Sequence, residues 1–314
     1  MESIDVKVVR KRALTPQIAE FTMEPIAGHS LPDFTPGAHI TVQTPSGAMR
    51  RYSLVGNGTA PASYTIAVKR EPASRGGSAS MHDNVAEGDR LSIEAPENDF
   101  ELSEANEYLL IAGGIGVTPI YAMAQELDRQ NKRFSIIYVT RSAGDTAYLD
   151  EMTARFGERI HIHHDDGDPD KLYDFWDHFA EPQKTHVFCC GPKPLMEEIK
   201  AVSGHWPEGR VHFEDFKPIE VVRADDTAFE VELSKSGGIV TVPEDRSILE
   251  ALRDAGHATV SSCESGTCGT CKTRLIAGKV DHRDMVLMDH EKDDTIMICV
   301  SRAAPGTGKL VLDL

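Results

Sequence analysis

One short loop of the chain carries three cysteines, and this loop restricts what the C-terminal part can fold into. In "SSCESGTCGTCKT", residues 261–273, Cys263, Cys268 and Cys271 have the spacing C-x4-C-x2-C, and Cys299 follows alone in "IMICVSR". Disulfides, zinc and an iron–sulfur cluster are the three explanations for such a group. The spacing is that of plant-type [2Fe–2S] sites, whereas zinc sites usually present two paired cysteine arms. We predict that all four cysteines bind a [2Fe–2S] cluster.

The rest of the sequence points to a reducing compartment. The N-terminal stretch "MESIDVKVVRKRALTPQ" lacks the apolar core of a secretory signal. The most apolar stretch, residues 109–124, is too short for a membrane span and is interrupted by glycines and a proline. We therefore expect a cytoplasmic protein, in which structural disulfides are rare. The formal net charge of −17 argues against nucleic acid or an anionic membrane as a partner, because both require basic surface.

The 314 residues separate into regions with different patterns. Residues 1–102 alternate short apolar runs with turn residues, which predicts an antiparallel β-barrel. Its strands are expected at 38–44, 49–56, 63–70 and 89–95. Residues 103–218 alternate strands with helices, which is typical of a parallel sheet covered on both faces. A linker is predicted at 219–228, and residues 229–314 combine strands, the cysteine loop and one helix at 244–256 with Ile248, Leu249 and Leu252 on one face.

The alternation in the second region is regular enough to place its elements. Strands are expected at 107–113, 133–140, 159–164, 185–191 and 210–216, and helices from Pro119, at 146–156, at 170–179 and from Pro194. The first helix is marked by apolar residues at helical spacing, namely Ile120, Met123, Ala124 and Leu127. Thr118 is expected to cap this helix, and Pro119 suits its first position.

A glycine-rich loop, "IAGGIGVTPI" at 111–120, joins the first of these strands to the first helix. Such a loop lets backbone N–H groups approach a phosphate at the positive end of a helix, which predicts nucleotide binding. The motif departs from the usual dinucleotide pattern, since Pro119 replaces the third glycine, and Arg141 ends the second strand, where it would suit a 2′-phosphate. Ligand sites of parallel sheets lie at the carboxyl ends of the strands. The loop "CCGPKPLM" at 189–196 is therefore expected beside the glycine loop, with Cys189 as a buried structural residue.

Two stretches of the first region have groups suited to a second cofactor. "RRYSL" at 50–54 reads as a strand whose alternation puts Arg50, Tyr52 and Leu54 on one face and Arg51 and Ser53 on the other. Downstream, "AVKREPASRGGSAS" at 67–80 ends in a glycine-rich turn. The guanidinium of Arg75 and the hydroxyl of Ser78 in that turn are suited to holding a phosphate.

These motifs together carry a resemblance. R-x-Y-S at 50–53, A-V-K at 67–69, the Gly-Gly-Ser turn, G-G-I-G-x-T-P at 113–119 and C-G-P at 190–192 resemble the ferredoxin–NADP⁺ reductase superfamily. With the C-terminal cysteine module, the chain is similar to the phthalate dioxygenase reductase group, and "GHWPEGRVHFEDF" and "DHRDMVL" add to that likeness. The resemblance covers nearly the whole chain. It implies a multi-domain fold: an antiparallel β-barrel flavin domain, an α/β parallel-sheet nucleotide domain and a C-terminal α+β ferredoxin-like (β-grasp) domain.

The resemblance also implies the residues of each site. FMN, rather than FAD, would lie against Tyr52 and Ser53, with its phosphate near Arg50 and the 75–78 turn, and Phe216 would cover one flavin face. The residues implied to bind FMN are Arg50, Arg51, Tyr52, Ser53, Ala67, Val68, Lys69, Arg75, Gly76, Gly77, Ser78 and Phe216. Those implied to bind NADH are Gly113, Gly114, Ile115, Gly116, Thr118, Pro119, Thr140, Arg141, Cys190, Gly191 and Pro192. Ser53, Cys190 and Phe216 are implied to take part in the reaction. The family's preference for NADH opposes a 2′-phosphate site at Arg141.

The three predicted cofactors can transfer electrons one after another. A nicotinamide gives two electrons as hydride, an iron–sulfur cluster accepts one at a time, and a flavin can do both. We therefore expect electrons to pass from NADH through the flavin and the cluster to a separate protein. By resemblance, that protein is the Rieske-type oxygenase of an aromatic-ring (phthalate-like) dioxygenase system. The alternatives are the reductase of a vanillate-type aromatic O-demethylase and a flavin and iron–sulfur redox sensor without turnover.

Two further patterns allow more than one interpretation. The acidic segment 281–294 would suit docking to a basic patch on the oxygenase, or it is an ordinary solvated helix and loop. The histidines at 161, 163 and 164 are expected to be solvated strand-end residues rather than metal ligands.

Overall fold

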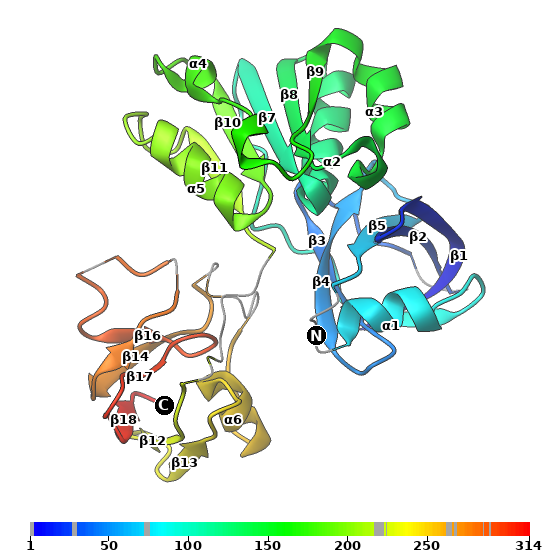
Figure 1. Ribbon diagram of the computed structural model, residues 1–314. Helices are drawn as coiled ribbons and strands as arrows, with labels where there is room; N and C mark the ends of the chain where they lie inside the picture. The colour runs from blue at the N-terminus through cyan, green and yellow to red at the C-terminus, as the bar shows by residue number, and fades with distance from the viewer. Residues whose placement is uncertain are drawn as a thin grey trace. The chain divides into compact units, whose positions relative to one another are not determined.

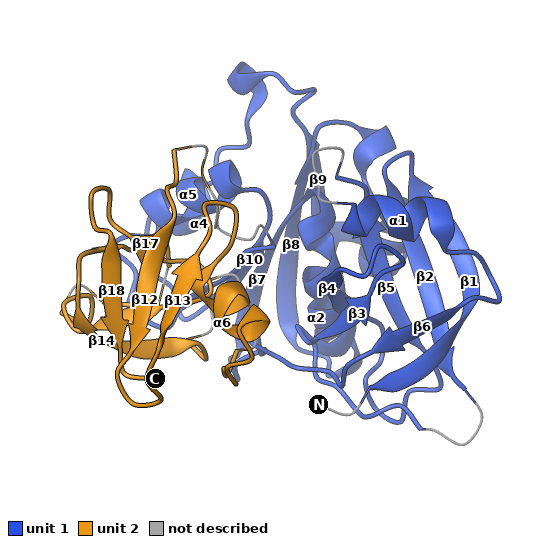
Figure 2. Ribbon diagram, turned by 90° about the horizontal axis from the view of Figure 1, so that it is seen from below, with its two compact units in different colours: residues 1–216 blue, residues 217–314 orange. Residues whose placement is uncertain are grey.

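A computed structural model of the chain describes residues 3–26, 30–71, 76–216, 223, 225–261, 266, 269–284, 286–288 and 290–314. The chain forms two compact units, residues 1–216 and 217–314 (Figure 2). The predicted barrel and parallel sheet fall in one unit because they share a hydrophobic core. In that core Ile18, Val55 and Ala67 of the barrel pack with apolar residues of the nucleotide-domain helices. The finer boundaries at 102, 218 and 228 stay predictions.

The first part of the chain forms a closed barrel with strand order β1–β2–β5–β4–β3–β6 (Figure 1). The strands are β1 (Ile4–Thr15), β2 (Ile18–Pro25), β3 (His39–Gln43), β4 (Met49–Val55), β5 (Tyr64–Lys69) and β6 (Arg90–Ile93). The prediction of an antiparallel barrel is confirmed, because each neighbouring pair of these strands is antiparallel. Helix α1 (Gly77–Asn84) was not expected. Its sequence, GSASMHDN, begins with glycine, contains two serines and has little apolar periodicity, so a turn was predicted there.

The second part of this unit is a parallel sheet with strand order β11–β10–β7–β8–β9. Its strands are β7 (Glu107–Gly113), β8 (Arg133–Thr140), β9 (Ile160–His164), β10 (His186–Cys190) and β11 (Val211–Glu214). The helices are α2 (Val117–Arg129), α3 (Leu149–Phe156), α4 (Trp176–Phe179) and α5 (Lys193–Val202). Alternation along β7 sends Leu110 into a core with α2 and α3, and Leu109 into a core with α4 and α5. Helices therefore cover both faces, as the sequence predicted (Figure 1).

Two local predictions about the helices are wrong. Helix α2 begins at Val117 rather than Pro119, because a 3₁₀ turn at Gly114–Gly116 runs directly into it. Thr118 consequently lies in the first turn and does not cap the helix, and its hydroxyl donates to the carbonyl of Ile115 at 3.1 Å. The helix expected at 170–179 is reduced to a 3₁₀ turn at Pro169–Lys171 and the short α4.

The second unit contains a mixed sheet with strand order β13–β12–β18–β14–β16. Its strands are β12 (Phe229–Leu233), β13 (Ile239–Val242), β14 (Lys272–Ala277), β16 (Thr295–Met297) and β18 (Lys309–Leu312), and β15 (Val280–Asp281) pairs with β17 (Arg302–Ala303). Helix α6 (Ile248–Asp254) starts at a capping box between Ser247 and Glu250. Its buried face, Ile248, Leu249 and Leu252, joins the core of the unit, as its spacing predicted.

Part of the predicted linker is bound into this second unit. The carboxylate of Asp226 accepts from both terminal nitrogens of Arg283, one at 2.8 Å, and lies 3.4 Å from Nε of the fully buried Arg302. The guanidinium of Arg283 lowers the pKa of Asp226 to about 2. Within the described ranges, each helix is too short or too polar to cross a lipid bilayer.

Candidate functional sites

Strand β4 presents two buried hydroxyls that the protein itself does not satisfy. Leu54 is buried in the barrel core and Tyr52 packs beside it, while Val55 packs outward against the α2 core. The hydroxyls of Tyr52 and Ser53 are both buried and have no hydrogen-bond partner among the described residues. Burial raises the pKa of Tyr52 to about 12, so its hydroxyl stays protonated. Because buried polar groups are normally paired, these two fit a bound group that supplies the missing partners, as a flavin would.

A cradle suited to an anion lies beside Arg50. Gly76 has a φ of 91° and caps α1, a left-handed conformation that a side chain disfavours. A Cβ on Gly77 would approach Nε of Arg50 to 2.9 Å, so the guanidinium lies directly against the helix start. The hydroxyl of Ser78 accepts from the backbone N–H of Glu71 at 3.0 Å. A helix N-terminus beside a guanidinium fits a flavin phosphate. Arg75 lies outside the described residues.

The other predicted flavin residues have different surroundings. Ala67 and Val68 of β5 are buried, and the half-buried Lys69 pairs with Glu71 at 3.2 Å. Arg51 is held on the outer face of the barrel, where its guanidinium donates to Asp99 at 2.7 Å. Phe216, the last residue of the first unit, is 38% exposed. Its ring can therefore cover a ligand without leaving a core.

Glu214 is a residue that the sequence reasoning missed. It ends β11 and pairs in register with Cys190 of β10. Its Oε2 is buried and has no hydrogen-bond partner among the described residues. Burial raises the pKa of this carboxyl to about 8, with Arg51 lowering it and Asp99 raising it. The signal was present in the sequence, because an acid at the carboxyl end of a parallel strand lies at the ligand-binding edge of the sheet.

The two glycine-containing loops of the nucleotide domain meet, as their strand positions predicted. A Cβ on Gly113 would come within 2.6 Å of Cδ of Pro192, and a Cβ on Gly116 would overlap the carbonyl oxygen of Cys190. A Cβ on Gly191 would lie 3.0 Å from Cα of Gly113. These glycines are therefore required for the close approach of the loops that follow β7 and β10. The resulting edge also leaves Ile115 partly exposed and places Thr118 and Pro119 in the first turn of α2.

The remaining predicted nucleotide residues divide into buried and exposed groups. Cys190 is fully buried, and burial raises the pKa of its thiol well above the ordinary value. The side chain is therefore an uncharged thiol rather than a thiolate. Cys189 is buried on the other face of the strand, as predicted. The hydroxyl of Thr140 contacts Oγ1 of Thr146 at 2.7 Å and Nδ1 of His164 at 2.9 Å. Arg141 is exposed at the end of β8.

Acidic residues after β9 adjoin this strand end. The N–H of Asp165 donates to the carbonyl of Thr140 at 3.1 Å, and the N–H of Asp166 donates to that of Arg141 at 2.8 Å. The carboxylate of Asp166 pairs with Lys171 at 2.8 Å. Two acids and one lysine therefore lie near the end of β8 together with Arg141.

Two of the predicted cluster ligands come together in the second unit. Cys271 directly precedes β14 and Cys299 follows β16, and these strands pair with Lys272 opposite Met297. Both cysteines are buried in one core cluster. Gly269, two residues before Cys271, has a φ of 80°, which favours glycine. Cys263 and Cys268 lie outside the described residues.

The acidic segment 281–294 is only partly a free surface. Asp281 pairs with Arg283 at 2.7 Å, the side chain of Asp284 is fully buried, and Glu291 pairs with Lys272. Asp293 and Asp294 are the exposed acids among its described residues.

Among the histidines at 161, 163 and 164, His163 hydrogen-bonds to the carbonyl of Lys171 at 2.7 Å.

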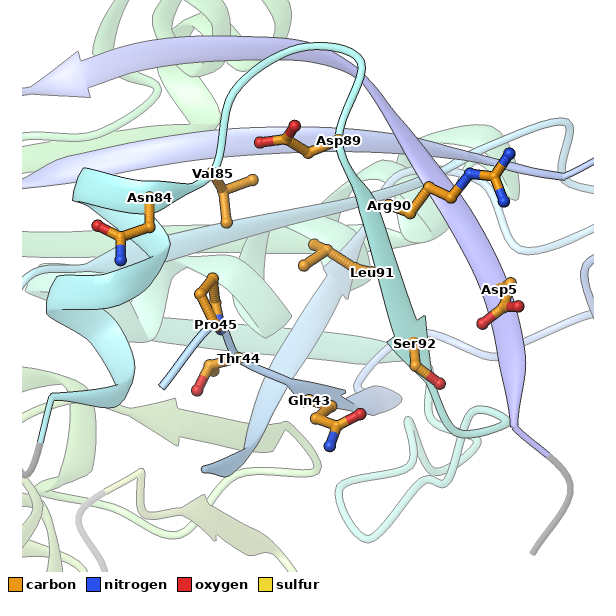
Figure 3. Close-up of a pocket in the computed structure, with 10 residues that line it drawn as sticks. All are labelled: Asp5, Gln43, Thr44, Pro45, Asn84, Val85, Asp89, Arg90, Leu91 and Ser92. Carbon is orange, nitrogen blue, oxygen red and sulfur yellow. The ribbon is translucent and has the colours of Figure 1, made fainter. Parts of the chain in front are cut away.

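A polar pocket of the barrel lies apart from the predicted sites. It has a volume of about 560 Å³ and lies between β6, the end of α1 and the turn after β3. Figure 3 shows its lining, in which Gln43, Asn84 and Ser92 are labelled. Its described lining includes no residue predicted to bind flavin or nucleotide.

Two family models match the chain. The oxidoreductase NAD-binding domain matches residues 110–201, and the 2Fe-2S iron-sulfur cluster binding domain matches residues 231–304. The first match covers both glycine loops, and the second covers all four predicted cluster cysteines. The second match therefore decides among disulfides, zinc and an iron–sulfur cluster in favour of the last.

Curated relatives align over almost the full length. The phthalate dioxygenase reductase of Burkholderia cepacia is 45% identical over 98% of this chain and 97% of its own. The phthalate 4,5-dioxygenase oxygenase reductase subunit of Pseudomonas putida is 47% identical over 98% of this chain and 96% of its own. The vanillate O-demethylase oxidoreductase of a Pseudomonas strain is 39% identical over 99% of this chain and 100% of its own.

A solved structure agrees with these relatives. The phthalate dioxygenase reductase described as a modular structure for electron transfer from pyridine nucleotides to [2Fe-2S] has a TM-score of 0.85 and 45% identity. The match covers 99% of this chain and 98% of that one. The order of barrel, nucleotide domain and ferredoxin-like domain along the chain is therefore shared with that protein.

Proposed function

This chain belongs to the phthalate dioxygenase reductase family, and we propose that it is the reductase component of a Rieske-type aromatic-ring oxygenase system. It is an oxidoreductase that carries electrons from NADH through a flavin to a [2Fe–2S] cluster. The observation that carries the proposal is the presence of three built sites in one chain. These are the unsatisfied hydroxyls of β4, the touching loops after β7 and β10, and the buried cysteines beside β14 and β16.

Residues of the barrel would hold the flavin, which we propose to be FMN. Ser53 and Tyr52 would supply hydrogen bonds to its ring system, since their hydroxyls are buried and unsatisfied within the described chain. Arg50 and the start of α1 would hold the phosphate by charge and by the backbone N–H groups of the helix N-terminus. When bound, a flavin converts a two-electron hydride donor into a source of single electrons.

Residues of the sheet edge would bind and orient NADH. The close approach of the loops at Gly113 and Gly191 leaves backbone rather than side chains facing the ligand, which suits a pyrophosphate. The thiol of Cys190 is neutral and buried, so it would shape the nicotinamide pocket without transferring charge. Glu214, beside it in register, would hold a proton at neutral pH, because burial raises its pKa to about 8.

The acids after β9 support NADH over NADPH. A carboxylate can accept a hydrogen bond from a ribose hydroxyl, but it repels a 2′-phosphate. Asp165 and Asp166 are anchored to the backbone of Thr140 and Arg141, where the adenosine ribose would lie in this type of sheet. We propose that they outweigh Arg141 in cofactor choice.

The partner proposal rests on the relatives' names. The higher identity to two phthalate systems favours a phthalate-like dioxygenase, and the vanillate O-demethylase oxidoreductase supports the second candidate. Cells keep their NADH in the cytoplasm, and we propose that location for this chain.

The test is reconstitution with purified components. The isolated protein should show flavin and iron–sulfur absorption, oxidise NADH continuously with an artificial acceptor, and support NADH-dependent turnover of a phthalate-type oxygenase. A protein that reduces the acceptor but supports only an O-demethylase would favour the second candidate. A protein that binds both cofactors without sustained NADH oxidation would instead be a redox sensor.

A further inference from the structure

The second unit contains a buried carboxylate that none of the proposed sites uses. The side chain of Asp284 is fully buried. Its Oδ2 accepts from the backbone N–H of Val286 at 3.2 Å and from that of Leu287 at 2.8 Å. Its Oδ1 accepts from the hydroxyl of Ser301 at 3.3 Å. A buried charge is costly unless it is paired or hydrogen-bonded, and these three hydrogen bonds offset that cost.

The first side of this network reaches the cysteine loop. A Cβ built on Gly269 would lie 3.5 Å from Cγ1 of Val286, which places Val286, at the start of the 286–288 segment, against the stretch between Cys268 and Cys271. Leu287 belongs to the core cluster that contains Cys271 and Cys299. By accepting from two successive N–H groups, Asp284 fixes the backbone of this covering segment.

The second side of the network reaches the remaining ligand. Ser301 is fully buried and lies two residues after Cys299. Its N–H donates to the carbonyl of Met297 at 2.9 Å, which closes the turn that carries Cys299. Its hydroxyl also accepts from the N–H of Arg283 at 3.2 Å. Asp284 and Ser301 therefore join the two chain segments that supply and cover the predicted cluster ligands.

We propose that Asp284 is a positioning residue for the iron–sulfur cluster, acting through Val286, Leu287 and Ser301. The proposal rests on the proposed function, since it requires the four cysteines to bind a cluster. Partners that orient the ligands of a metal centre typically change its affinity about 10- to 100-fold when they are removed. A buried negative charge near a cluster also opposes the addition of an electron, so its loss should favour the reduced state.

The test compares three variants of the full-length holoenzyme. Asp284→Asn removes the charge and part of the network, Ser301→Ala removes only the bridge to the Cys299 turn, and Asp293→Asn removes an exposed acid from the same segment. The readouts are the rate of cluster bleaching with a chelator under anaerobic conditions and the midpoint potential from spectroelectrochemistry. NADH-dependent dye reduction, which needs only the first unit, checks that each variant is folded there.

We expect bleaching about tenfold faster in Asp284→Asn, with a more positive midpoint potential. Ser301→Ala should bleach faster but keep the potential close to that of the parent, and Asp293→Asn should change neither. If Asp284→Asn fails to load a cluster, Ser301→Ala still decides the point. Unchanged bleaching and potential in both Asp284→Asn and Ser301→Ala would overturn the proposal. A parent protein that never binds iron would instead contradict the proposed function.

Discussion

The nucleotide edge of the first unit and the cysteine site of the second are built in opposite ways. At the edge, the chain removes side chains: Gly113, Gly116 and Gly191 let two loops touch, and backbone faces the ligand. At the cysteine site, the chain uses side chains: Cys271 and Cys299 are buried, and Asp284 binds the segments around them. We therefore expect substitutions that add side-chain atoms to disrupt the nucleotide edge, and substitutions that remove side-chain atoms to disrupt the cysteine site.

The largest effect is expected from removing a cluster ligand. Cys299→Ser should abolish reduction of a one-electron protein acceptor while leaving NADH-dependent dye reduction within about twofold, because the proposed flavin and nucleotide sites lie in the other unit. Steady-state assays with both acceptors measure this. The matched control is Cys189→Ser, which changes a buried cysteine that is predicted not to bind iron. Equal loss in both assays would show that the cluster is not a separate outlet.

A smaller effect is expected from adding one atom to the nucleotide edge. In Gly116→Ala the new methyl group would overlap the carbonyl oxygen of Cys190, so the two loops must separate. We expect a loss of about 1–3 kcal/mol in the free energy of unfolding and a higher KM for NADH. Gly144→Ala is the control, since its Cβ would meet only the hydroxyl of Ser142 at 3.7 Å. Similar behaviour of both variants would refute the packing argument.

Cofactor choice should respond to the acids after β9. The double variant Asp165→Asn with Asp166→Asn should raise the ratio of kcat/KM for NADPH to that for NADH about tenfold, because a repulsion worth about 1.4 kcal/mol is removed. Arg141→Ala should lower the same ratio, and Asp170→Asn should leave it unchanged. A ratio that follows Arg141 alone would mean that the arginine, not the acids, sets the preference.

The stability of the folded protein should depend on pH through the protonation of Glu214. Its pKa rises from 4.5 in the unfolded chain to about 8 in the folded one. Between these two pH values the folded state therefore binds more protons than the unfolded state. The stabilisation that comes from protonated Glu214 is complete below about pH 4.5 and declines as the pH rises towards 8. In the flavin-free protein, Glu214→Gln should flatten that decline, by at most about 1.4 kcal/mol per pH unit. Thermal unfolding from pH 5 to 9 measures it, and parallel curves would contradict the assignment.

The smallest effect is expected at the exposed acids of the second unit. Reversing Asp293 and Asp294 to lysine should change the rate of partner reduction by only about threefold and reduce its salt dependence, because exposed rim charges act mainly on encounter. An unchanged salt dependence would remove these two residues from the docking surface.

The sequence predicted the elements whose signals are local and repeated. The strands of residues 107–216 and the apolar face of α6 appear where expected, because periodicity follows from burial. Helix α1 could not be predicted, since its glycine and two serines are poor helix formers and its position depends on contacts with Arg50 and Ser46. The start of α2 was placed late because a 3₁₀ turn leads into it.

Features that depend on distant contacts were also missed. The raised pKa of Glu214 follows from its burial beside Cys190 and from the charges of Arg51 and Asp99, and these contacts are known only from the structure. The role of Asp226 within the predicted linker depends on Arg283, which lies far along the chain. The assignment of individual flavin and nucleotide residues stays a prediction. The placement of Arg75, Cys263 and Cys268 falls outside the described residues.

The central claim is that one chain connects the nucleotide edge to the cysteine site. Anaerobic titration of the full-length holoenzyme with NADH, followed by optical and low-temperature electron paramagnetic resonance spectra, tests it directly. We predict that NADH bleaches the flavin absorption and produces the signal of a reduced [2Fe–2S] cluster, and that Cys299→Ser loses only the second change. Flavin bleaching in the parent protein with a cluster that stays oxidised, at any NADH concentration, would contradict the account.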